Sequence, residues 1–278
     1  MGASAPDGTA VGQVSVWQEP VAISFEGVSK SFGDGRVVAL DRVSMAIRNR
    51  EFLTIVGPSG SGKTTFLRLI NRLADPTDGS VHVDGVNVRE TDPIALRRRI
   101  GYVFQGIGLF PHLTVGENIA ITPALLGWDE ARKRARVDTL LDLVRLDRHK
   151  YCDRFPHELS GGERQRVGIA RAIAAEPRIV LMDEPFGALD PLTRDALGRD
   201  YRQLHQDLGL TSVMVTHDIL EAALLADRII VLQAGRIIAD AQPQTLMVGD
   251  QGEYVDELMQ TPRRQAERLH ALMTRERP

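Results

Sequence analysis

The sequence predicts an α/β protein whose largely parallel sheet is covered by helices. Short, wholly apolar runs such as Phe52–Val56 and Ile179–Met182 are typical of strands buried on both faces. Between them lie longer runs in which apolar residues recur every three or four positions, the spacing of a helix. Strands that alternate with helices in this way form βα units, whose strands run parallel. A chain of 278 residues can bury a core of this size.

The first expected elements are strands. Val21–Phe25 and Val43–Ile47 are strand-like and are separated by a turn at Asp34-Gly35. Residues 1–20 are small, polar and interrupted by Gly and Pro, so we expect a flexible leader there. The elements expected next are a strand over Phe52–Val56, a helix over Lys63–Leu73, a hairpin strand between Asp78-Gly79 and Asp84-Gly85, a helical turn over Pro93–Arg99 and a strand over Ile100–Phe104.

The pattern changes over residues 106–164, where we expect a mostly helical insertion. One amphipathic helix is expected to follow Asp129, whose side chain suits a helix N-cap. Its apolar residues recur at i, i+3, i+4 and i+7, namely Val137, Leu140, Leu141 and Val144.

Strands and helices alternate again after the insertion. A helix-like run covers Glu163–Ala175, and Pro191–Leu208 is a helix expected to turn four apolar residues inward: Leu197, Tyr201, Leu204 and Leu208. The remaining expectations are strands over Ile179–Met182, Thr211–Val215 and Ile229–Leu232, a helix over Ile219–Ala226 and a helical tail over 243–278. Residues 21–242 are thus expected to form one domain.

Composition excludes several classes of protein. A net charge of −3 argues against a general nucleic-acid binder, so no nucleic-acid partner is expected. No apolar run approaches the roughly 18 residues that span a bilayer. Cys152 is the only cysteine, so no intramolecular disulfide can form, which fits a reducing cytoplasm.

The residues Gly57-Pro58-Ser59-Gly60-Ser61-Gly62-Lys63-Thr64 fit the phosphate-loop pattern G-x-x-x-x-G-K-[ST]. Its glycines let backbone N–H groups wrap a phosphate, Lys63 reaches the outer phosphates and the Thr64 hydroxyl ligates Mg²⁺. The alternative without a function is a Gly/Ser loop that matches the pattern by chance. A strand precedes the loop and a helix follows it, as the pattern requires.

Two carboxylates, Asp183 and Glu184, follow the apolar run that ends at Met182. Open α/β sheets bind their ligands at the carboxyl ends of strands, where both side chains would emerge. Asp183 suits a direct or second-sphere Mg²⁺ partner, and Glu184 suits a base that polarises an attacking water. The alternative for Glu184 is a cap on the following turn.

Two further strands end in polar residues. Ile100–Phe104 is followed by Gln105, which suits a bridge between Mg²⁺ and the attacking water. Thr211–Val215 is followed by Thr216 and His217, and the imidazole suits a contact with a terminal phosphate and with Glu184. Taken alone, a Gln or His at a strand end is more often a loop residue that makes local hydrogen bonds. Their convergence on one edge of one sheet favours a common site.

Two more elements have both a functional and a purely structural interpretation. Ser160, Gly161 and Gly162 open a helix, and the N–H groups of a helix N-terminus bind anions; the alternative is an ordinary loop before a helix. Phe32 precedes the first turn and suits stacking on a nucleobase; the alternative is a core aromatic at a strand end.

In order and spacing, these residues resemble the ATP-binding cassette (ABC) family from about Val21 to Gln242. Gly57–Thr64 resembles its Walker A loop, Gln105 its Q-loop and Leu159–Glu163 its signature motif. Val180–Glu184 resembles Walker B with the catalytic glutamate, Ala188–Asp190 the D-loop and His217 the switch histidine. Gly187 and Phe32 depart from the serine and tyrosine common in the family, and neither departure removes ATP binding.

The resemblance implies a P-loop NTPase fold with an N-terminal antiparallel β subdomain and an inserted helical subdomain. It implies ATP and Mg²⁺ as cofactors, with Glu184, His217 and Gln105 catalytic and Thr64, Gln105 and Asp183 at the metal. The nucleotide contacts it implies are Phe32, Gly57, Pro58, Ser59, Gly60, Ser61, Gly62, Lys63, Thr64, Thr65, Ser160, Gly161, Gly162, Glu163 and Asp190. In a head-to-tail dimer, Ser160, Gly161 and Gly162 of one copy would cap the ATP held by Gly57–Thr64 of the other.

Within the family, Ile70–Leu73 with Asp75–Gly79, and Gly106–His112, resemble importers of glycine betaine, choline or carnitine. Such a chain would be a peripheral motor at the cytoplasmic face of the inner membrane. It would dock on transmembrane permease subunits and act indirectly with a periplasmic or lipid-anchored substrate-binding protein.

Three classes compete. A DNA-maintenance cassette would carry long coiled coils or zinc modules, and fewer than about a hundred residues separate Lys63 from Ser160, without heptads or a cysteine cluster. An export or lipid-trafficking cassette, or one for another solute, stays open. The importer is the function that the residues favour.

Overall fold

The computed structural model describes residues 20–33, 35–106, 108–249, 251–261, 264 and 267. The expected leader, apart from Pro20, lies outside the described residues, as do Asp34 of the expected turn and most of the tail beyond 261.

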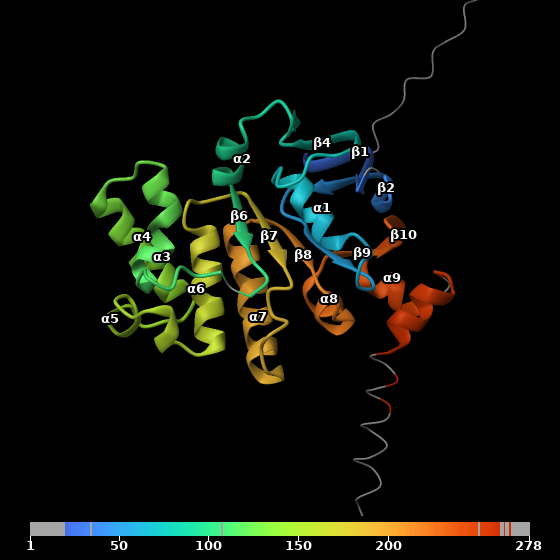
Figure 1. Cartoon of the computed structure of the whole chain (residues 1–278). Helices are drawn as coiled ribbons and strands as arrows, with labels where there is room; N and C mark the ends of the chain where they lie inside the picture. The colour runs from blue at the N-terminus through green and yellow to red at the C-terminus, as the bar shows by residue number, and fades with distance from the viewer. Residues whose placement is uncertain are drawn as a thin grey trace, which may run out of the picture.

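A six-stranded sheet forms the centre of the molecule (Figure 1). The five strands from β9 to β6 run parallel, and only the edge strand β10 is antiparallel to its neighbour. The mostly parallel sheet expected from the sequence is therefore confirmed. The strand order is β10 (Arg236–Ala241), β9 (Arg228–Gln233), β3 (Phe52–Val56), β8 (Thr211–Val215), β7 (Ile179–Asp183) and β6 (Ile100–Val103).

A second, antiparallel sheet lies at the N-terminal side, at the upper right of Figure 1. The expected strand from Val21 is longer than the sequence indicated and continues to Phe32, because Gly27 adopts a positive φ of 60° at a register shift and lets the strand go on. The strand order is β2 (Val37–Arg48), β1 (Val21–Phe32), β4 (Asp78–Val83) and β5 (Val86–Asn87).

Helix α1 (Lys63–Ile70) packs between the two sheets. Phe66 on α1 stacks on Phe25 of β1 with ring centroids 4.1 Å apart, and both belong to one buried apolar cluster. The helix ends before Leu73, where the sequence pattern had placed its end. Arg72 has a positive φ of 54°, and Leu73 turns out to solvent.

Two helices, α6 (Gly161–Ile173) and α7 (Pro191–Leu208), cover the opposite face of the large sheet. Their apolar side chains form a second buried cluster with Val180 and Met182 of β7, whereas the alternate residues Ile179 and Leu181 belong to the cluster of α1. The sheet thus separates α1 from α6. Leu208, expected inward, is 42% exposed because α7 ends there.

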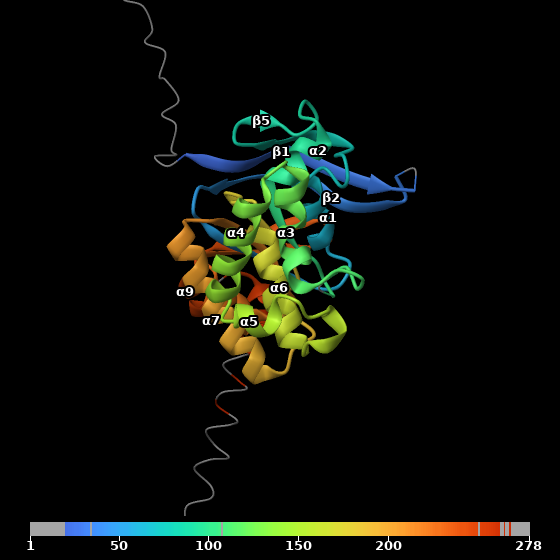
Figure 2. The same ribbon diagram turned by 90° about the vertical axis from the view of Figure 1, so that its left-hand side faces the viewer.

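The helical insertion lies beside β6, on the left of Figure 1 and facing the viewer in Figure 2. Asp129 caps α4 as expected, accepting a hydrogen bond from the N–H of Arg132, and the four predicted apolar residues of α4 and its C-cap are buried. The insertion contains α3 (Val115–Leu125), α4 (Glu130–Leu143), α5 (Arg148–Tyr151) and the 3₁₀ turn η1 (Pro156–Glu158).

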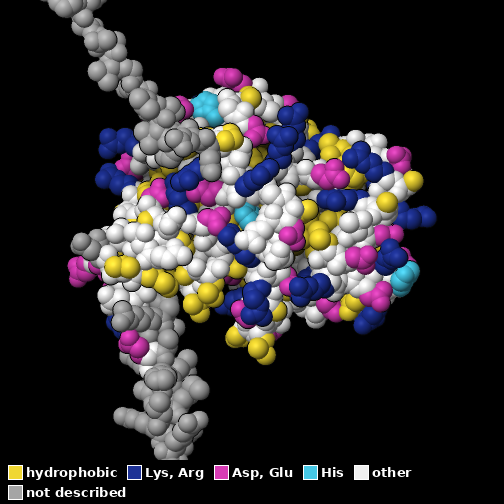
Figure 3. Space-filling view, turned by 180° about the vertical axis from the view of Figure 1, so that it is seen from behind, with side chains coloured by type: hydrophobic (Ala, Val, Ile, Leu, Met, Phe, Trp, Pro, Cys, Tyr) yellow, Lys and Arg dark blue, Asp and Glu magenta, His cyan; other side chains and the backbone are white. Residues whose placement is uncertain are grey.

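The last described elements close the far edge of the large sheet. Helix α8 (Ile219–Leu225), helix α9 (Pro243–Val248) and the helical residues 253–261 share a third apolar cluster with β9. The short helix α2 (Pro93–Arg99) leads into β6. Of the helices in the described part of the chain, none is long and apolar enough to cross a bilayer. Seen from behind, basic and acidic side chains are interspersed on the surface (Figure 3).

Candidate active site

The loop between β3 and α1 is shaped by its glycines. Gly57 has a φ of 152° and Gly62 a φ of 106°, and a Cβ at either position would lie 2.0 and 2.1 Å from the backbone oxygens of Leu232 and Ala39, respectively. No other residue fits such close approaches of the backbone. Gly60, with a φ of 78°, completes the tight path of the loop.

Lys63 and Ser61 place polar atoms inside this loop. The Lys63 ammonium donates to the carbonyl oxygens of Gly57 and Pro58 at 2.8 and 2.9 Å. Burial lowers the pKa of Lys63, and the nearby carboxylates of Glu184 and Asp183 oppose that shift. The Ser61 hydroxyl is buried without a hydrogen-bond partner. A buried hydroxyl and a cation held over a glycine loop fit a phosphate group.

Thr64 and Asp183 bring the loop and β7 together. The Thr64 hydroxyl donates to Asp183 Oδ1 at 3.1 Å, across 119 positions of sequence. Burial raises the pKa of Asp183, and the hydrogen bond from Thr64 opposes the shift. A hydroxyl and a carboxylate oxygen side by side are ligands that Mg²⁺ accepts.

Glu184 lies where two other strand ends meet. Its Oε2 accepts a hydrogen bond from Gln105 Nε2 at 3.2 Å and lies 3.3 Å from Nδ1 of His217. Glu184 has a positive φ of 45°, uncommon for a residue with a side chain, which aims the carboxylate at these two neighbours. The alternative role as a turn cap therefore has no support from its side chain.

Ser160 caps α6, as the glycine-opened helix suggested, although α6 begins at Gly161 rather than Glu163. The Ser160 hydroxyl accepts from the Glu163 N–H at 3.3 Å, and Glu163 Oε2 accepts from the Ser160 N–H at 2.8 Å. The remaining oxygen, Oε1, accepts from the Tyr151 hydroxyl at 2.6 Å. These bonds from Tyr151 and the Ser160 backbone lower the pKa of Glu163.

The glycines after Ser160 border the start of α7. A Cβ on Gly162 would lie 2.7 Å from Cγ2 of Thr193, and Thr193 N–H donates to Asp190 at 3.0 Å. Asp190 is exposed and caps α7, and hydrogen bonds from Thr193 lower its pKa. The Ser160 loop and Asp190 thus lie along one surface.

Phe32 is 45% exposed at the end of β1, which excludes the alternative of a core aromatic. The Lys30 ammonium lies 4.8 Å from its ring centre. An exposed ring at this position is compatible with the stacking on a nucleobase that the sequence suggested, which stays a prediction.

The predicted site residues fall into two groups. The glycine loop, Thr64, Asp183, Glu184, Gln105 and His217 are joined through the contacts above. The Ser160 loop and Asp190 form a separate group, because α6 and α7 lie across the sheet from α1. Sequence reasoning missed Tyr151, which belongs to the second group and carries no spacing pattern that links it to Glu163.

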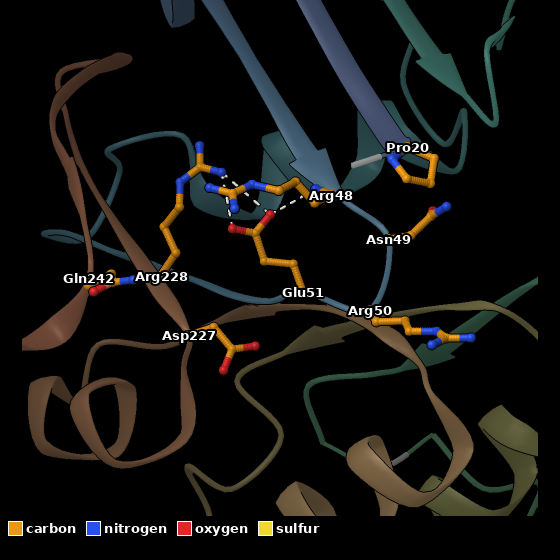
Figure 4. Close-up of a pocket in the computed structure, with 8 residues that line it drawn as sticks. All are labelled: Pro20, Arg48, Asn49, Arg50, Glu51, Asp227, Arg228 and Gln242. Carbon is orange, nitrogen blue, oxygen red and sulfur yellow. Dashed lines mark hydrogen bonds and ion pairs between the residues drawn. The ribbon is translucent and has the colours of Figure 1, made fainter. Parts of the chain in front are cut away.

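A cavity of about 560 Å³ lies at the other end of β3, away from both groups (Figure 4). Glu51 there accepts hydrogen bonds from the Arg48 N–H and from Arg228, which ties the starts of β3 and β9 to the end of β2. The glycine loop, Gln105, Glu184 and His217 lie at the carboxyl ends of the strands, whereas this cavity lies where β3 and β9 begin, so it is not part of that site.

A glycine loop between a buried strand and a helix, with acidic residues at the end of another parallel strand of the same sheet, defines a phosphate-loop nucleotide-binding protein. A family model described as ABC transporter matches residues 40–187. The chain belongs to the ABC transporter family.

Relatives and solved structures agree with this family. The choline transport ATP-binding protein OpuBA of Bacillus subtilis (strain 168) is 48% identical over 237 residues, which are 85% of this chain and 62% of OpuBA. The glycine betaine uptake system ATP-binding protein YehX of Escherichia coli (strain K12) is 43% identical over 84% of this chain and 75% of YehX. The chain therefore spans less than two thirds of the length of OpuBA.

The fold matches a solved structure described as the dimeric structure of MJ0796, a bacterial ABC transporter cassette. The TM-score is 0.72 and the identity is 36%, over 80% of this chain and 98% of MJ0796. The antiparallel N-terminal sheet and the mostly parallel sheet with its helices are those of the ABC cassette.

Proposed function

We propose that the chain is the ATP-hydrolysing motor subunit of a bacterial ABC importer for quaternary-amine osmoprotectants. The observation that carries the ATPase assignment is the meeting of Gln105, Glu184 and His217 through contacts of 3.2 and 3.3 Å beside the glycine loop. These residues come from three separate strand ends. If Gln105 and His217 had only local structural roles, there would be no reason for both to contact the carboxylate of Glu184.

The residues present fit ATP and Mg²⁺. The buried, unpartnered Ser61 hydroxyl and the close glycine path fit the phosphates, with Lys63 able to exchange loop carbonyls for phosphate oxygens. Thr64 and Asp183, with Gln105, would hold Mg²⁺, which supplies positive charge against the phosphates. Phe32 would stack on adenine.

Glu184 is the proposed general base. Its carboxylate is oriented by Gln105 and His217 and would accept the proton of the attacking water as oxygen bonds to the terminal phosphorus. His217 would stabilise the negative charge of the Glu184 carboxylate before it accepts the proton, and it would also contact the terminal phosphate. Lys63 would offset the negative charge that develops on the departing ADP.

We further propose that two copies share each ATP. Ser160, Gly161 and Gly162 place backbone N–H groups at the start of α6, and they lie across the sheet from the glycine loop of their own chain. A second copy placed head to tail would bring these donors and Asp190 to the phosphates. The dimeric cassette structure of MJ0796 supports this arrangement. Cleavage of ATP removes the bridging charge and loosens the dimer.

A groove of about 400 Å³ beside the Gln105 segment, the residues from Phe104 to Phe110, supports docking on a permease. Phe104 and Phe110 line it and are 45% and 43% exposed, and Ile121 extends it onto α3 of the helical insertion. Exposed aromatic side chains next to a catalytic residue suit a protein partner such as a permease, whose conformational changes must be transmitted to the ATP site. We therefore propose that the chain lies peripherally at the cytoplasmic face of the membrane and that a substrate-binding protein acts through the permease.

The names of OpuBA and YehX support a quaternary amine as the transported solute. A cassette for another solute, or for export or lipid trafficking, is the second candidate. A substrate-binding protein encoded beside this chain would distinguish them: binding of choline or glycine betaine by that protein supports the importer, and binding only of another solute overturns the osmoprotectant assignment.

The ATPase itself is tested by phosphate release from the purified chain over a range of protein concentrations. A shared site predicts that turnover per chain rises with concentration and that EDTA abolishes it. Turnover independent of concentration, or none at any concentration with Mg²⁺ present, would contradict the proposal.

A further inference from the structure

Tyr151 makes a short hydrogen bond to the residue that shapes the Ser160 loop. Its hydroxyl donates to Glu163 Oε1 at 2.6 Å, from the last residue of α5 to the first turn of α6. The ring is 9% exposed and packs in the apolar cluster of α6. The ammonium of Lys150 and the guanidinium of Arg154, both close to Tyr151 in sequence, lie 5.0 and 5.1 Å from the ring centre.

Glu163 passes this constraint to Ser160. With Oε1 held by Tyr151, Oε2 is fixed toward the Ser160 N–H at 2.8 Å, and the Ser160 hydroxyl accepts from the Glu163 N–H in return. Hydrogen bonds to a carboxylate are short and strong, so the two that Glu163 accepts, one on each oxygen, define the orientation of its side chain closely. The backbone at Ser160 follows that orientation.

A second capping box in the same chain shows that the bond from Tyr151 is not needed to start a helix. At the start of α3, Glu117 and Thr114 make the same two reciprocal bonds. Within the described part of the chain no hydroxyl is bonded to the Glu117 carboxylate. Since a capping box forms without a third bond, the tyrosine at Glu163 adds orientation beyond helix initiation.

We propose that Tyr151 is a positioning residue for the proposed ATPase: its hydroxyl fixes Glu163, and Glu163 fixes the Ser160-Gly161-Gly162 loop that meets the ATP of a second copy. This inference rests on the proposed function. Tyr151 touches no substrate itself, so its effect falls on dimer closure rather than on the binding of ATP to a single chain.

The test compares Tyr151→Phe with Tyr201→Phe, each in a Glu184→Gln background that accumulates ATP-bound dimers. Both variants keep a buried ring and lose one hydroxyl; that of Tyr201 bonds Ser212 at 2.8 Å in the core, away from the loop. We expect Tyr151→Phe to raise the dimer dissociation constant with ATP by about tenfold, the size of one hydrogen bond to a charged group. ATP affinity at concentrations where the chain is monomeric stays within about twofold of the parent.

A double variant separates positioning from packing. In a Glu163→Ala background, Tyr151→Phe should have no further effect on dimer formation, because its route to Ser160 is already removed. Additive losses would overturn the proposal, as would an unchanged dimer dissociation constant in Tyr151→Phe or an equal loss in Tyr201→Phe. If the Glu184→Gln parent never dimerises with ATP, the proposed function fails first, which is a distinguishable result.

Discussion

Gln105 Nε2 lies 3.2 Å from Glu184 Oε2, although 79 residues separate the two along the chain. They meet because β6 and β7 are parallel neighbours and both side chains follow the carboxyl ends of these strands. The contact links the Gln105 segment, which borders the proposed permease groove, to the proposed base. A change at the groove therefore has a short physical route to the reacting atoms.

Glu184→Gln should keep ATP binding and lose turnover. The amide retains the size and hydrogen-bonding reach of the carboxylate but cannot take a proton, so we expect steady-state phosphate release to fall at least about 100-fold. Size-exclusion chromatography with ATP should show a trapped dimer. Glu176→Gln, a change in an exposed ion pair with Arg132, is the matched control and should behave as the parent. Near-normal turnover in Glu184→Gln would remove it as the base.

Thr64→Val should separate nucleotide binding from the Mg²⁺ requirement. Valine matches threonine in shape but lacks the hydroxyl that bonds Asp183. We expect ATP affinity in EDTA to change little, while turnover at a fixed Mg²⁺ concentration falls at least about tenfold. Thr139→Val removes an exposed hydroxyl that bonds only the Ala135 carbonyl and serves as control. An unchanged Mg²⁺ dependence would argue against a metal at Thr64.

Phe32→Ala should weaken ATP by about tenfold, since stacking of a base on an aromatic ring contributes about 1–3 kcal/mol. Phe32→Tyr should restore the affinity. Calorimetry with inorganic tripolyphosphate provides an internal control, because this ligand has no base and should bind Phe32→Ala and the parent alike. An equal loss for both ligands would mean that Phe32 supports the loop rather than the base.

His205 should make folding sensitive to acid. The imidazole is buried against Phe52, with Nδ1 2.9 Å from the Ser212 hydroxyl, and burial lowers its pKa from 6.5 to about 4. Between these values the unfolded chain binds a proton that the folded chain does not. The free energy of unfolding therefore falls as pH falls from 6.5 toward 4, by up to about 3 kcal/mol from this group.

Urea unfolding at pH 7 and pH 4.5 measures the effect of His205. In His205→Gln the loss of stability between the two pH values should be smaller than in the parent by about 2 kcal/mol. Parallel losses in the two proteins would show that His205 does not titrate between the folded and unfolded states in this range.

Local signals account for the elements that the sequence predicted to the residue. Helix α7 starts with Asp190 as N-cap and Pro191 in the first turn and ends at Gly209, whose φ of 60° suits a C-terminal cap. The strands β3 and β8 are buried at every position, and each ends at a residue that the sequence marks as a break, Gly57 after β3 and the polar Thr216 after β8. Their burial on both faces leaves little freedom in where they begin and end.

The elements that the sequence did not predict lack such signals. Strand β10 pairs on one side only and is mostly exposed, so its residues show no buried pattern. Helix α3 contains Pro123 and has apolar residues all around it, because it packs against α4 and α6 together.

The candidate site divides in the same way. The expectation of a parallel sheet was enough to predict that Gln105, Glu184 and His217 converge, because parallel strands bring their carboxyl ends to one edge. The contact between Tyr151 and Glu163 depends on how α5 packs against α6, which no residue spacing encodes. The bonds from Lys63 to the carbonyls of Gly57 and Pro58 likewise follow from the path of the loop.

The placement of α1 and α6 on opposite faces of the large sheet has a genetic consequence. In the proposed dimer, a mutation in the glycine loop and a mutation in the Ser160 loop affect different halves of each shared site. When two such alleles are expressed together, each heterodimer has two ATP sites. One site contains both mutations, and the other contains neither. Partial restoration of transport between two inactive alleles is therefore expected in a merodiploid, and two lesions in the same loop should never restore it.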